Sequence, residues 1–314
     1  MRAATIRGKE IVIEEHPDPV AQAGEVLVRV HAAGLNGADM MQRRGLYPAP
    51  PGSPQDIPGM ELAGEVAALG PGVERFAVGE RVMAIVGGGG QAELATVHER
   101  QLMPVPDALD WPAAGGLPEV FITAHDALFS QAELRSGEHL LVHGGAGGVG
   151  TAAIQLARAV GARVSATVRR EEMREQVAAL GAEVIAPEGF AEHGPFDVIL
   201  ELVGAPNLAE NLQALATGGR ISIIGVSAGA KGELNLLALM GKRARIHGST
   251  LRARPLEEKA LVARRVEHEV LPLFESSPPA LHVPIAETFP LEQAEAAYER
   301  FAAGGKLGKI VLTV

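Results

Sequence analysis

The sequence predicts an α/β protein that combines a barrel-like β domain with a doubly wound parallel-sheet domain. Its 314 residues are too many for one small core and suit two domains. The first third is rich in short strand-like runs that Gly and Pro interrupt, whereas strand and helix patterns alternate after about Trp111. Together these three observations predict a β-rich domain followed by a sheet with helices on its faces.

Short runs in the first third favour a barrel. Ile11–Ile13, Glu25–Val30, Glu61–Val66 and Glu80–Ile85 are strand-like. In Glu25–Val30 apolar and polar residues alternate, as in a strand with one buried face. Breaks such as Pro48–Gly52 lie between these runs and indicate long connections. This pattern is typical of a barrel-like domain with long loops.

The second part of the chain shows the alternation of a parallel α/β sheet. Apolar residues recur at helical spacing over residues 149–160 and 173–180, each time between two strand-like runs. Strands separated by helices imply right-handed crossovers and a parallel sheet. After about Arg254 a helix, a further helix from Glu292 and a last strand could return to the first domain. The predicted strands are His139–His143, Ala162–Val168, Glu183–Ile185, Phe196–Leu200, Arg220–Ile224, Ala244–His247 and Lys309–Leu312.

Composition and charge exclude several classes of protein. The formal net charge of −10 disfavours general affinity for nucleic acid, because binding a polyanion needs a basic face. The chain has no cysteine, which excludes disulfides, thiolate zinc sites and a cysteine nucleophile. The first residues lack the apolar core of a secretory signal, and no run of about 18 apolar residues predicts a membrane span. We therefore expect a cytoplasmic protein without nucleic-acid or membrane partners.

A glycine-rich loop between a strand and a helix predicts dinucleotide binding. Gly145, Gly147 and Gly150 have the spacing GxGxxG, directly after the strand at 139–143. Small residues are needed because the turn is tight, the backbone approaches a pyrophosphate, and the helix packs close to the sheet. The alternatives are a turn that only packs two elements, or a methyltransferase-type loop. The predicted cofactor-binding residues of this loop are Gly145, Ala146, Gly147, Gly148, Val149 and Gly150.

The end of the next strand favours NADPH over NADH as the cofactor. An NAD enzyme usually places an acidic residue about 20 positions beyond the loop, where it binds the ribose 2′-hydroxyl. Here Arg169 and Arg170 stand at that place, and two guanidinium groups would attract a 2′-phosphate. In the alternative, Glu171 or Glu172 takes the hydroxyl and the arginines face solvent.

Several long stretches carry a family resemblance. They are AAGLNGADMMQRRGLYPAPPG, IPGMELAGEVAALGPGVERFAVGERVMA, LPEVFITAHDAL, LVHGGAGGVGTAAIQLARAVGA, GSTLRAR and GKIVL, in this order. In them the chain resembles the zinc-free quinone oxidoreductase branch of the medium-chain dehydrogenase/reductase superfamily. The resemblance covers nearly the whole chain. It implies a GroES-like domain over residues 1–116 and 255–314, a Rossmann domain over residues 117–254, and a homodimer.

The resemblance also bears on the metal and the acceptor. In the zinc alcohol dehydrogenases of this superfamily a Cys precedes an Asp and a His precedes a Glu, and the corresponding positions here are Asn36, Asp39, Met60 and Glu61. Two metal ligands are thereby lost, so we expect no metal. Without a Lewis acid the enzyme needs an easier acceptor than an alcohol or simple ketone. The implied reaction is hydride transfer from NADPH to a quinone or another small conjugated carbonyl compound.

The same resemblance assigns the candidate site residues. Asn36 and Tyr47 are the implied catalytic residues; the alternatives are a turn-forming Asn and a partly buried ring. Val203, Gly204, Gly225 and Val226 would follow strand ends, where parallel sheets bind ligands. The other implied cofactor contacts are Thr123, Ser249, Thr250 and Lys309.

Two further functions stay open at this point. An NADPH-dependent enone or activated-alkene reductase would use the same residues, because the choice of acceptor depends on the shape of the site. A protein that binds NADPH without significant turnover is the second alternative. Retention of Asn36 and Tyr47 favours chemistry over binding alone. A methyltransferase is disfavoured by the β-rich first domain and the paired arginines.

Overall fold

The chain folds into two units, and each is built from more than one stretch of the sequence. The computed structural model describes residues 1–278 and 280–314. Unit 1 comprises Met1–Ile122, Leu251–Gly304 and Lys309–Val314, and unit 2 comprises Thr123–Thr250 and Gly305–Gly308. Each unit therefore has its own core, and the last strand of the chain returns to unit 1.

Unit 1 is built on a largely antiparallel sheet in which β3 (Glu25–Gly34) is the central strand. The strand order is β14-β15-β3-β4-β5-β7, and β6 also pairs with β3. β1 and β2 form a separate antiparallel hairpin. The other strands of this unit are β1 (Arg2–Arg7), β2 (Glu10–Glu15), β4 (Glu61–Leu69), β5 (Arg81–Ile85), β6 (Leu94–His98), β7 (Met103–Pro104), β14 (Ile285–Pro290) and β15 (Lys309–Thr313).

The alternating pattern of β3 explains its central place. Val26, Val28 and Val30 point into the core of unit 1, whereas Arg29 is exposed. The strand pairs with β4 and β6 along its first part and with β15 along its last part. The pairing with β4 is interrupted twice by register shifts, and such bulges bend a strand. The bent strand can therefore take part in a curled, barrel-like sheet.

Helices cover the sheet of unit 1. α10 packs on the hairpin and on β14 and β15, where Tyr298 and Ala297 are fully buried. α2 packs on β3, β4 and β15. Its close approach needs Gly115, because a Cβ there would lie 2.6 Å from the Cβ of Ala32. The helices are α1 (Gly37–Arg43), α2 (Trp111–Gly116), α8 (Leu256–Glu269), α9 (Leu271–Phe274) and α10 (Ala294–Ala303), and α3 (Pro118–His125) begins in this unit.

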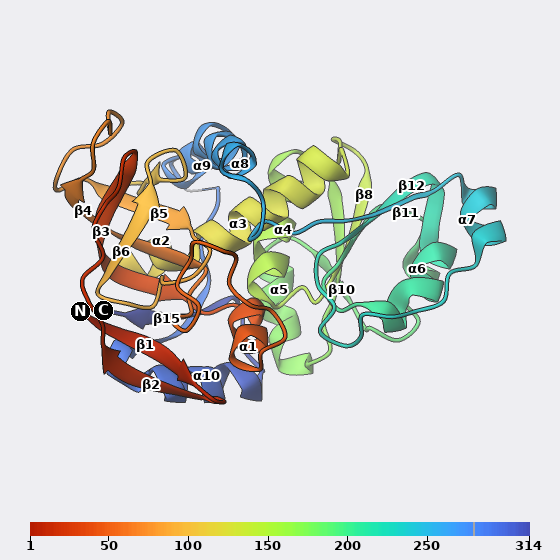
Figure 1. The fold of residues 1–314 in the computed structure, drawn as a ribbon. Helices are drawn as coiled ribbons and strands as arrows, with labels where there is room; N and C mark the ends of the chain where they lie inside the picture. Colours follow the sequence, from red (N-terminus) through yellow and green to blue (C-terminus); the bar gives the residue numbers. More distant parts are fainter. Residues whose placement is uncertain (279) are drawn as a thin grey trace. The chain divides into compact units, whose positions relative to one another are not determined.

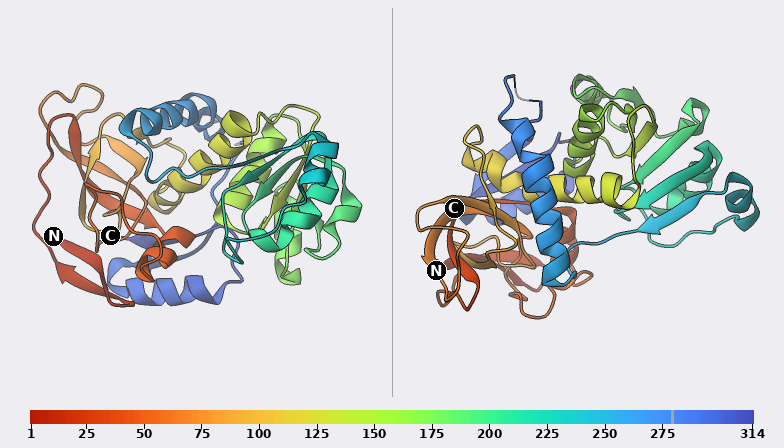
Figure 2. Two further views of the ribbon diagram at one scale, coloured as in Figure 1. Left: turned by 45° about the vertical axis from the view of Figure 1, so that its right-hand side comes forward. Right: turned by 90° about the horizontal axis from the view of Figure 1, so that it is seen from above.

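Unit 2 is a doubly wound parallel sheet. The order of its strands is β10-β9-β8-β11-β12-β13, which reads 3-2-1-4-5-6 in chain order and places the switch point between β8 and β11. Helices α4 and α5 lie on one face of this sheet and α6 and α7 on the other (Figure 1; Figure 2). The strands are β8 (His139–His143), β9 (Arg163–Thr167), β10 (Glu183–Ile185), β11 (Phe196–Glu201), β12 (Leu215–Ile223) and β13 (Arg245–Gly248). The helices are α4 (Gly148–Ala159), α5 (Arg174–Ala179), α6 (Leu208–Ala214) and α7 (Leu236–Lys242).

The predicted fold class is confirmed: a GroES-like domain is combined with a Rossmann domain. The predicted strands of the parallel sheet match β8 to β13, because buried β-branched runs between helical patterns give a strong signal. β1, β6, β7 and β14 were not predicted, since they are short or lack a clear alternation. Within residues 1–278 and 280–314, no helix has the length and apolar character that crossing a membrane requires.

Candidate active site

Three neighbouring strands bring Asn36, Glu61 and Lys309 together at one end of the unit 1 sheet. β4 and β15 lie on either side of β3 and run antiparallel to it. The first residues of β4 and β15 therefore lie beside the last residues of β3. Glu61 begins β4, Lys309 begins β15, and Asn36 stands two residues after β3. The antiparallel topology thus assembles residues that are up to 273 positions apart.

A closed hydrogen-bond cluster joins these three side chains. The Lys309 ammonium donates to Glu61 Oε1 and Asn36 Oδ1, both at 2.6 Å. It also donates to the Leu35 carbonyl at 2.9 Å. Asn36 Nδ2 donates to Glu61 Oε1 at 2.9 Å, and the backbone N–H of Glu119 donates to Glu61 Oε2 at 2.8 Å. Glu61 and Lys309 are 0% and 2% exposed, so the ion pair depends on these partners rather than on water.

Gly34 leaves the space that the Glu61 carboxylate needs. A Cβ at Gly34 would lie 2.2 Å from Glu61 Oε1, a distance no alanine could adopt. The carboxylate therefore reaches the end of β3 only because this residue is glycine. A glycine two positions before Asn36 was the sequence signal that could have pointed to this close approach.

Asp39 supports the same end of the sheet from α1. It is the third residue of the helix, and its Oδ2 accepts the backbone N–H of Asn36 at 2.8 Å in a capping box. Its Oδ1 accepts the backbone N–H of Gly59 at 3.2 Å. Burial raises the pKa of Asp39 to about 6, although these hydrogen bonds and the charge of Lys309 act in the opposite direction. Asp39 thus fixes the backbone of Asn36 from a fully buried position.

We expect Asp39 to make the stability of the protein depend on pH in an unusual direction. Its folded-state pKa of about 6 lies above the usual value of 3.8, so the native state holds its proton to higher pH than the unfolded state. Relative to Asp39→Asn, the wild-type free energy of unfolding should fall between about pH 4 and 6, by up to roughly 3 kcal/mol. It should then stay level above that window. Urea unfolding of both proteins across this pH range measures the difference, and a rising difference would contradict the assignment.

Tyr47 lies in a loop that a buried arginine holds in place. Arg252 is 1% exposed, and its guanidinium donates to the Tyr47 carbonyl at 3.0 Å, to the Gly87 carbonyl at 2.8 Å and to Gln42 Oε1 at 2.5 Å. The same guanidinium lies over the Tyr47 ring, 5.2 Å from its centroid. Burial raises the pKa of the Tyr47 hydroxyl, and the charge of Arg252 partly opposes this. The hydroxyl therefore stays protonated at neutral pH and is a hydrogen-bond donor.

The glycine loop of unit 2 has the geometry of a phosphate cradle. Gly147 is the N-cap of α4 and gives it no side-chain cap, so the first N–H groups of this 12-residue helix meet no capping side chain. A Cβ at Gly150 would lie 2.4 Å from the Gly144 carbonyl oxygen, and one at Gly145 would lie 2.8 Å from the Cβ of Ala166. Only glycine permits this path. The Gly308 N–H donates to the Ala146 carbonyl at 2.9 Å, so Gly308 lies directly against the loop.

The two predicted arginines follow the end of β9. Both are exposed. Arg170 contacts Glu172 at 3.4 Å and lies against Gly305, where a Cβ would come within 2.6 Å of Arg170 Nη1. Gly305 has a φ of +64°, and its segment belongs to unit 2. The structure therefore brings Arg170, the glycine loop and residues 305–308 to the same edge of unit 2.

The loop with Val203 and Gly204 is tied to the glycine loop by a buried polar network. Glu201 Oε1 accepts the backbone N–H groups of Val203 (2.7 Å) and Gly204 (2.8 Å). Asn211 donates to Glu201 Oε2 at 2.7 Å, and its Oδ1 lies 2.7 Å from His143 Nε2. The network then continues from His143 Nδ1 through a threonine hydroxyl to the Gly144 N–H, at 3.2 Å in each step. Burial lowers the pKa of His143, which favours the neutral ring. In that form Nε2–H donates to Asn211 Oδ1 and Nδ1 accepts the threonine hydroxyl proton.

The remaining predicted cofactor residues, apart from Lys309, also belong to unit 2. Thr123 is buried in α3, and Ser249 and Thr250 follow β13 directly. Ser249 Oγ lies 3.4 Å from Asp126 Oδ2. Gly225 and Val226 follow β12, where a Cβ at Gly225 would lie 2.4 Å from the Leu202 carbonyl oxygen. By contrast, Asn36, Tyr47 and Lys309 belong to unit 1, so the predicted residues fall into two sets.

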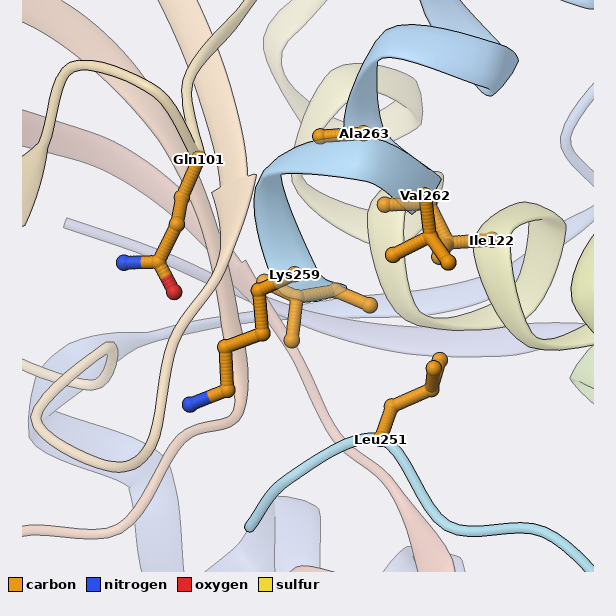
Figure 3. A pocket seen from close by; sticks show the side chains of 7 residues that line it. Gln101, Ile122, Leu251, Lys259, Val262 and Ala263 are labelled. Carbon is orange, nitrogen blue, oxygen red and sulfur yellow. The ribbon is translucent and has the colours of Figure 1, made fainter. Parts of the chain in front are cut away.

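Two pockets within unit 1 do not contain the predicted residues. One is lined by Ile122, Leu251, Lys259 and Val262 among others, with a volume of ≈ 10 Å³, which is room for about one water molecule (Figure 3). A shallow groove elsewhere on unit 1, of ≈ 380 Å³, has the Arg75–Glu267 ion pair in its wall. Neither holds a side chain from the cluster around Asn36. In the described part of the chain, no group of three or more His, Asp or Glu is placed to hold a metal ion.

Sequence reasoning missed two residues that support the site. Arg252 and Asn211 make the contacts described above, but each is a single polar residue whose partners its neighbours in the sequence do not indicate. Their roles depend on partners far away in the chain. The signal for Arg252 was its place in GSTLRAR, one of the stretches that carry the family resemblance.

Comparisons with known proteins agree with this architecture. The family model described as "Alcohol dehydrogenase GroES-like domain" matches residues 22–107, and the one described as "Zinc-binding dehydrogenase" matches residues 148–267. The quinone oxidoreductase of Rattus norvegicus is 33% identical over 306 residues, which cover 94% of this chain and 90% of that protein.

Solved structures give the same result. The quinone oxidoreductase from Thermus thermophilus, whose structure was also solved as a complex with NADPH, has a TM-score of 0.86 and 33% identity, over 100% of both chains. An alcohol dehydrogenase superfamily protein from Novosphingobium aromaticivorans has a TM-score of 0.86 and 32% identity, over 100% of this chain and 99% of that one. The chain belongs to the medium-chain dehydrogenase/reductase superfamily, on its quinone oxidoreductase branch.

Proposed function

We propose that this protein is an NADPH-dependent, zinc-independent reductase that transfers hydride to a quinone. The observation that carries the proposal is the glycine loop of a doubly wound sheet with two arginines at the end of the adjacent strand, β9. The names of the relatives support the choice of a quinone as acceptor. That the chain is an oxidoreductase with a nicotinamide cofactor follows from its family.

The residues of unit 2 fit the cofactor. The loop of residues 145–150 would hold the pyrophosphate, because side chains are absent there and the first N–H groups of α4 meet no capping side chain. Arg169 and Arg170 would bind the 2′-phosphate. The loops at Val203–Gly204, Gly225–Val226 and Ser249–Thr250, with Thr123, are proposed as further contacts. When bound, NADPH supplies a hydride.

The residues of unit 1 would stabilise the charge that develops on the acceptor. A quinone or enone that accepts hydride places negative charge on its oxygen, and positioned N–H or O–H donors lower the energy of that state. Asn36 offers an amide N–H and Tyr47 a hydroxyl that stays protonated at neutral pH. Tyr47 could also pass its proton to the oxygen, as a weak acid.

The residues that stand at the zinc-ligand positions of this family do not fit a zinc ion. The chain has no cysteine, so no thiolate is present. Asn36 Oδ1 and Glu61 Oε1 already surround the Lys309 ammonium at 2.6 Å, so a second cation would face a positive charge. We therefore derive no step through a metal.

The sharpest test compares cofactors and acceptors in one assay. We expect rapid oxidation of NADPH with a benzoquinone or naphthoquinone, unaffected by a chelator, and much slower oxidation of NADH. In the variant Arg169→Ser/Arg170→Ser the KM for NADPH should rise about 10- to 100-fold while the KM for NADH changes little. The matched control is Arg163→Ser, since Arg163 is exposed at the opposite end of the same strand.

The outcomes separate the alternatives. Turnover with an enone only would keep the mechanism and make the protein an activated-alkene reductase. Tight NADPH binding without turnover on any acceptor would favour a non-catalytic NADPH-binding protein. A preference for NADH would refute the role given to the arginines and favour Glu171 or Glu172 as the ribose ligand.

A homodimer is part of the proposal. β13 is an edge strand of the unit 2 sheet in the described residues, so its outer backbone groups are open to pairing. Leu236, Leu237 and Met240 on α7 are 64%, 78% and 71% exposed, which is unusual for side chains of this size. A second copy of the chain pairing through this region would cover them. A monomer in sedimentation equilibrium at micromolar concentration would contradict the proposal.

A further inference from the structure

We propose that Lys309 is a positioning residue for Asn36: its buried ammonium fixes the Asn36 amide so that N–H groups, rather than the amide oxygen, are offered to the acceptor. The proposal rests on the proposed function, because it assigns a supporting residue to the acceptor site. Its physical basis is the cluster of Lys309, Glu61 and Asn36 in unit 1.

The orientation of the amide follows from donors and acceptors. A lysine ammonium has three N–H donors and no acceptor, so the atom of Asn36 that lies 2.6 Å from it must be the oxygen. The NH₂ group then lies beside the Glu61 carboxylate, and one of its N–H groups donates to Glu61 Oε1 at 2.9 Å. A flipped amide would set donors against the ammonium and oxygen against the Glu61 carboxylate. The ion pair therefore selects one of the two amide orientations.

The second N–H of Asn36 is left with a weak internal partner. Its nearest acceptor is the Gly34 carbonyl oxygen at 3.4 Å, well beyond the usual length of such a hydrogen bond. A bound quinone oxygen can compete for this N–H. Asn36 is 8% exposed, whereas Lys309 is 2% exposed, so the amide and not the ammonium is the more accessible of the two groups.

The ammonium of Lys309 is fully used within this cluster. Its three donors meet three oxygens, on Glu61, Asn36 and Leu35. The sequence suggested Lys309 as a cofactor contact. In the structure the Lys309 ammonium is instead hydrogen-bonded to three oxygens of unit 1. We therefore assign Lys309 a positioning role rather than direct contact with the cofactor.

Variants can separate this role from simple folding. Lys309→Met removes the charge at similar length but leaves the Glu61 carboxylate buried without its cation, which endangers folding. The double variant Lys309→Met/Glu61→Gln removes both charges and keeps a hydrogen-bonding group beside Asn36. Lys9→Met is the matched control, since Lys9 is an exposed lysine of unit 1.

The experiment measures three quantities on the whole protein: the Kd for NADPH, the kcat and KM for p-benzoquinone, and the side-chain amide signals of Asn36 in ¹H–¹⁵N NMR. For the folded double variant we expect kcat/KM for the quinone to fall about 10- to 100-fold. The Kd for NADPH should stay within about twofold of wild type, because the ammonium is engaged away from the cofactor. The two Asn36 amide protons, held by the cluster in the wild type, should change their chemical shifts and exchange faster with solvent, because the amide loses its fixed partners.

Other outcomes would overturn either this proposal or the proposed function on which it rests. If the Kd for NADPH rises as much as kcat/KM falls, Lys309 is a cofactor ligand. If kcat/KM and the Asn36 signals match those of the wild type and of Lys9→Met, the cluster is structural only. If the wild type reduces no acceptor, the proposed function fails, yet the Asn36 signals still decide whether Lys309 fixes the amide.

Discussion

Replacing Gly150 by alanine should abolish useful NADPH binding. The added Cβ would lie 2.4 Å from the Gly144 carbonyl oxygen and 2.9 Å from the Gly145 Cα, and these backbone atoms cannot move without opening the loop. We expect the Kd for NADPH to rise at least about 100-fold, equivalent to about 2.7 kcal/mol of binding free energy. The free energy of unfolding should fall by about 1–3 kcal/mol, as in other overpacked sites. Quenching or enhancement of nicotinamide fluorescence measures the first quantity and urea unfolding the second.

Gly241→Ala is the matched control for this substitution. Gly241 lies in α7 of the same unit, and a Cβ there meets no atom within 4 Å. Alanine also has the higher helix propensity, so this variant should keep its affinity for NADPH and be equally or slightly more stable. If both variants bind NADPH as the wild type does, the loop is only a packing turn and the cofactor site lies elsewhere.

Replacing Arg252 by methionine should have the largest effect in unit 1. Three acceptors would lose their donor at once: the carbonyl oxygens of Gly87 and Tyr47 and the side chain of Gln42. Unsatisfied buried acceptors destabilise a protein by about 1–3 kcal/mol each, and we expect a total loss of about 3–5 kcal/mol because the loop can relax in part. The kcat/KM for a quinone should fall about 100-fold, since the loop that carries Tyr47 loses its anchor.

Tyrosine titration gives a direct readout of the Arg252 contact. The chain has two tyrosines, and burial raises the pKa of Tyr298 well above that of an ordinary tyrosine, so Tyr47 ionises first. Removing the guanidinium should raise the pKa of Tyr47 further, because the charge of Arg252 now favours the tyrosinate. Arg44→Met serves as the control, since Arg44 is exposed beside the same loop. An unchanged tyrosinate titration in Arg252→Met would show that the two groups do not interact.

The glycine loop and its sheet could be predicted because their signals are local. The spacing of Gly145, Gly147 and Gly150 lies within a few residues, and strand and helix periodicities surround it. The alternation of buried residues in β3 is local as well. β7 was not predicted because its two residues carry too little pattern to stand out.

The roles of the polar residues could not be read in the same way. Asn36 and Tyr47 were proposed from family resemblance. The residues next to them in the sequence do not indicate that Asn36 contacts Lys309 or that Tyr47 contacts Arg252. The hydrogen bonds that join them span 273 and 205 residues. A buried polar residue is stable only with a partner, but the identity of that partner depends on strand order.

The sequence by itself determined the class of this protein: a β-rich part followed by a parallel α/β part, a glycine-rich loop between a strand and a helix, the absence of cysteine and a pair of arginines at a strand end. The tertiary structure decided what the charged and amide side chains do. Because β4 and β15 run antiparallel to β3 on its two sides, Glu61 and Lys309 meet at Asn36. There, away from water, an ammonium needs three acceptors and a carboxylate needs its cation, so each side chain is held in a single orientation.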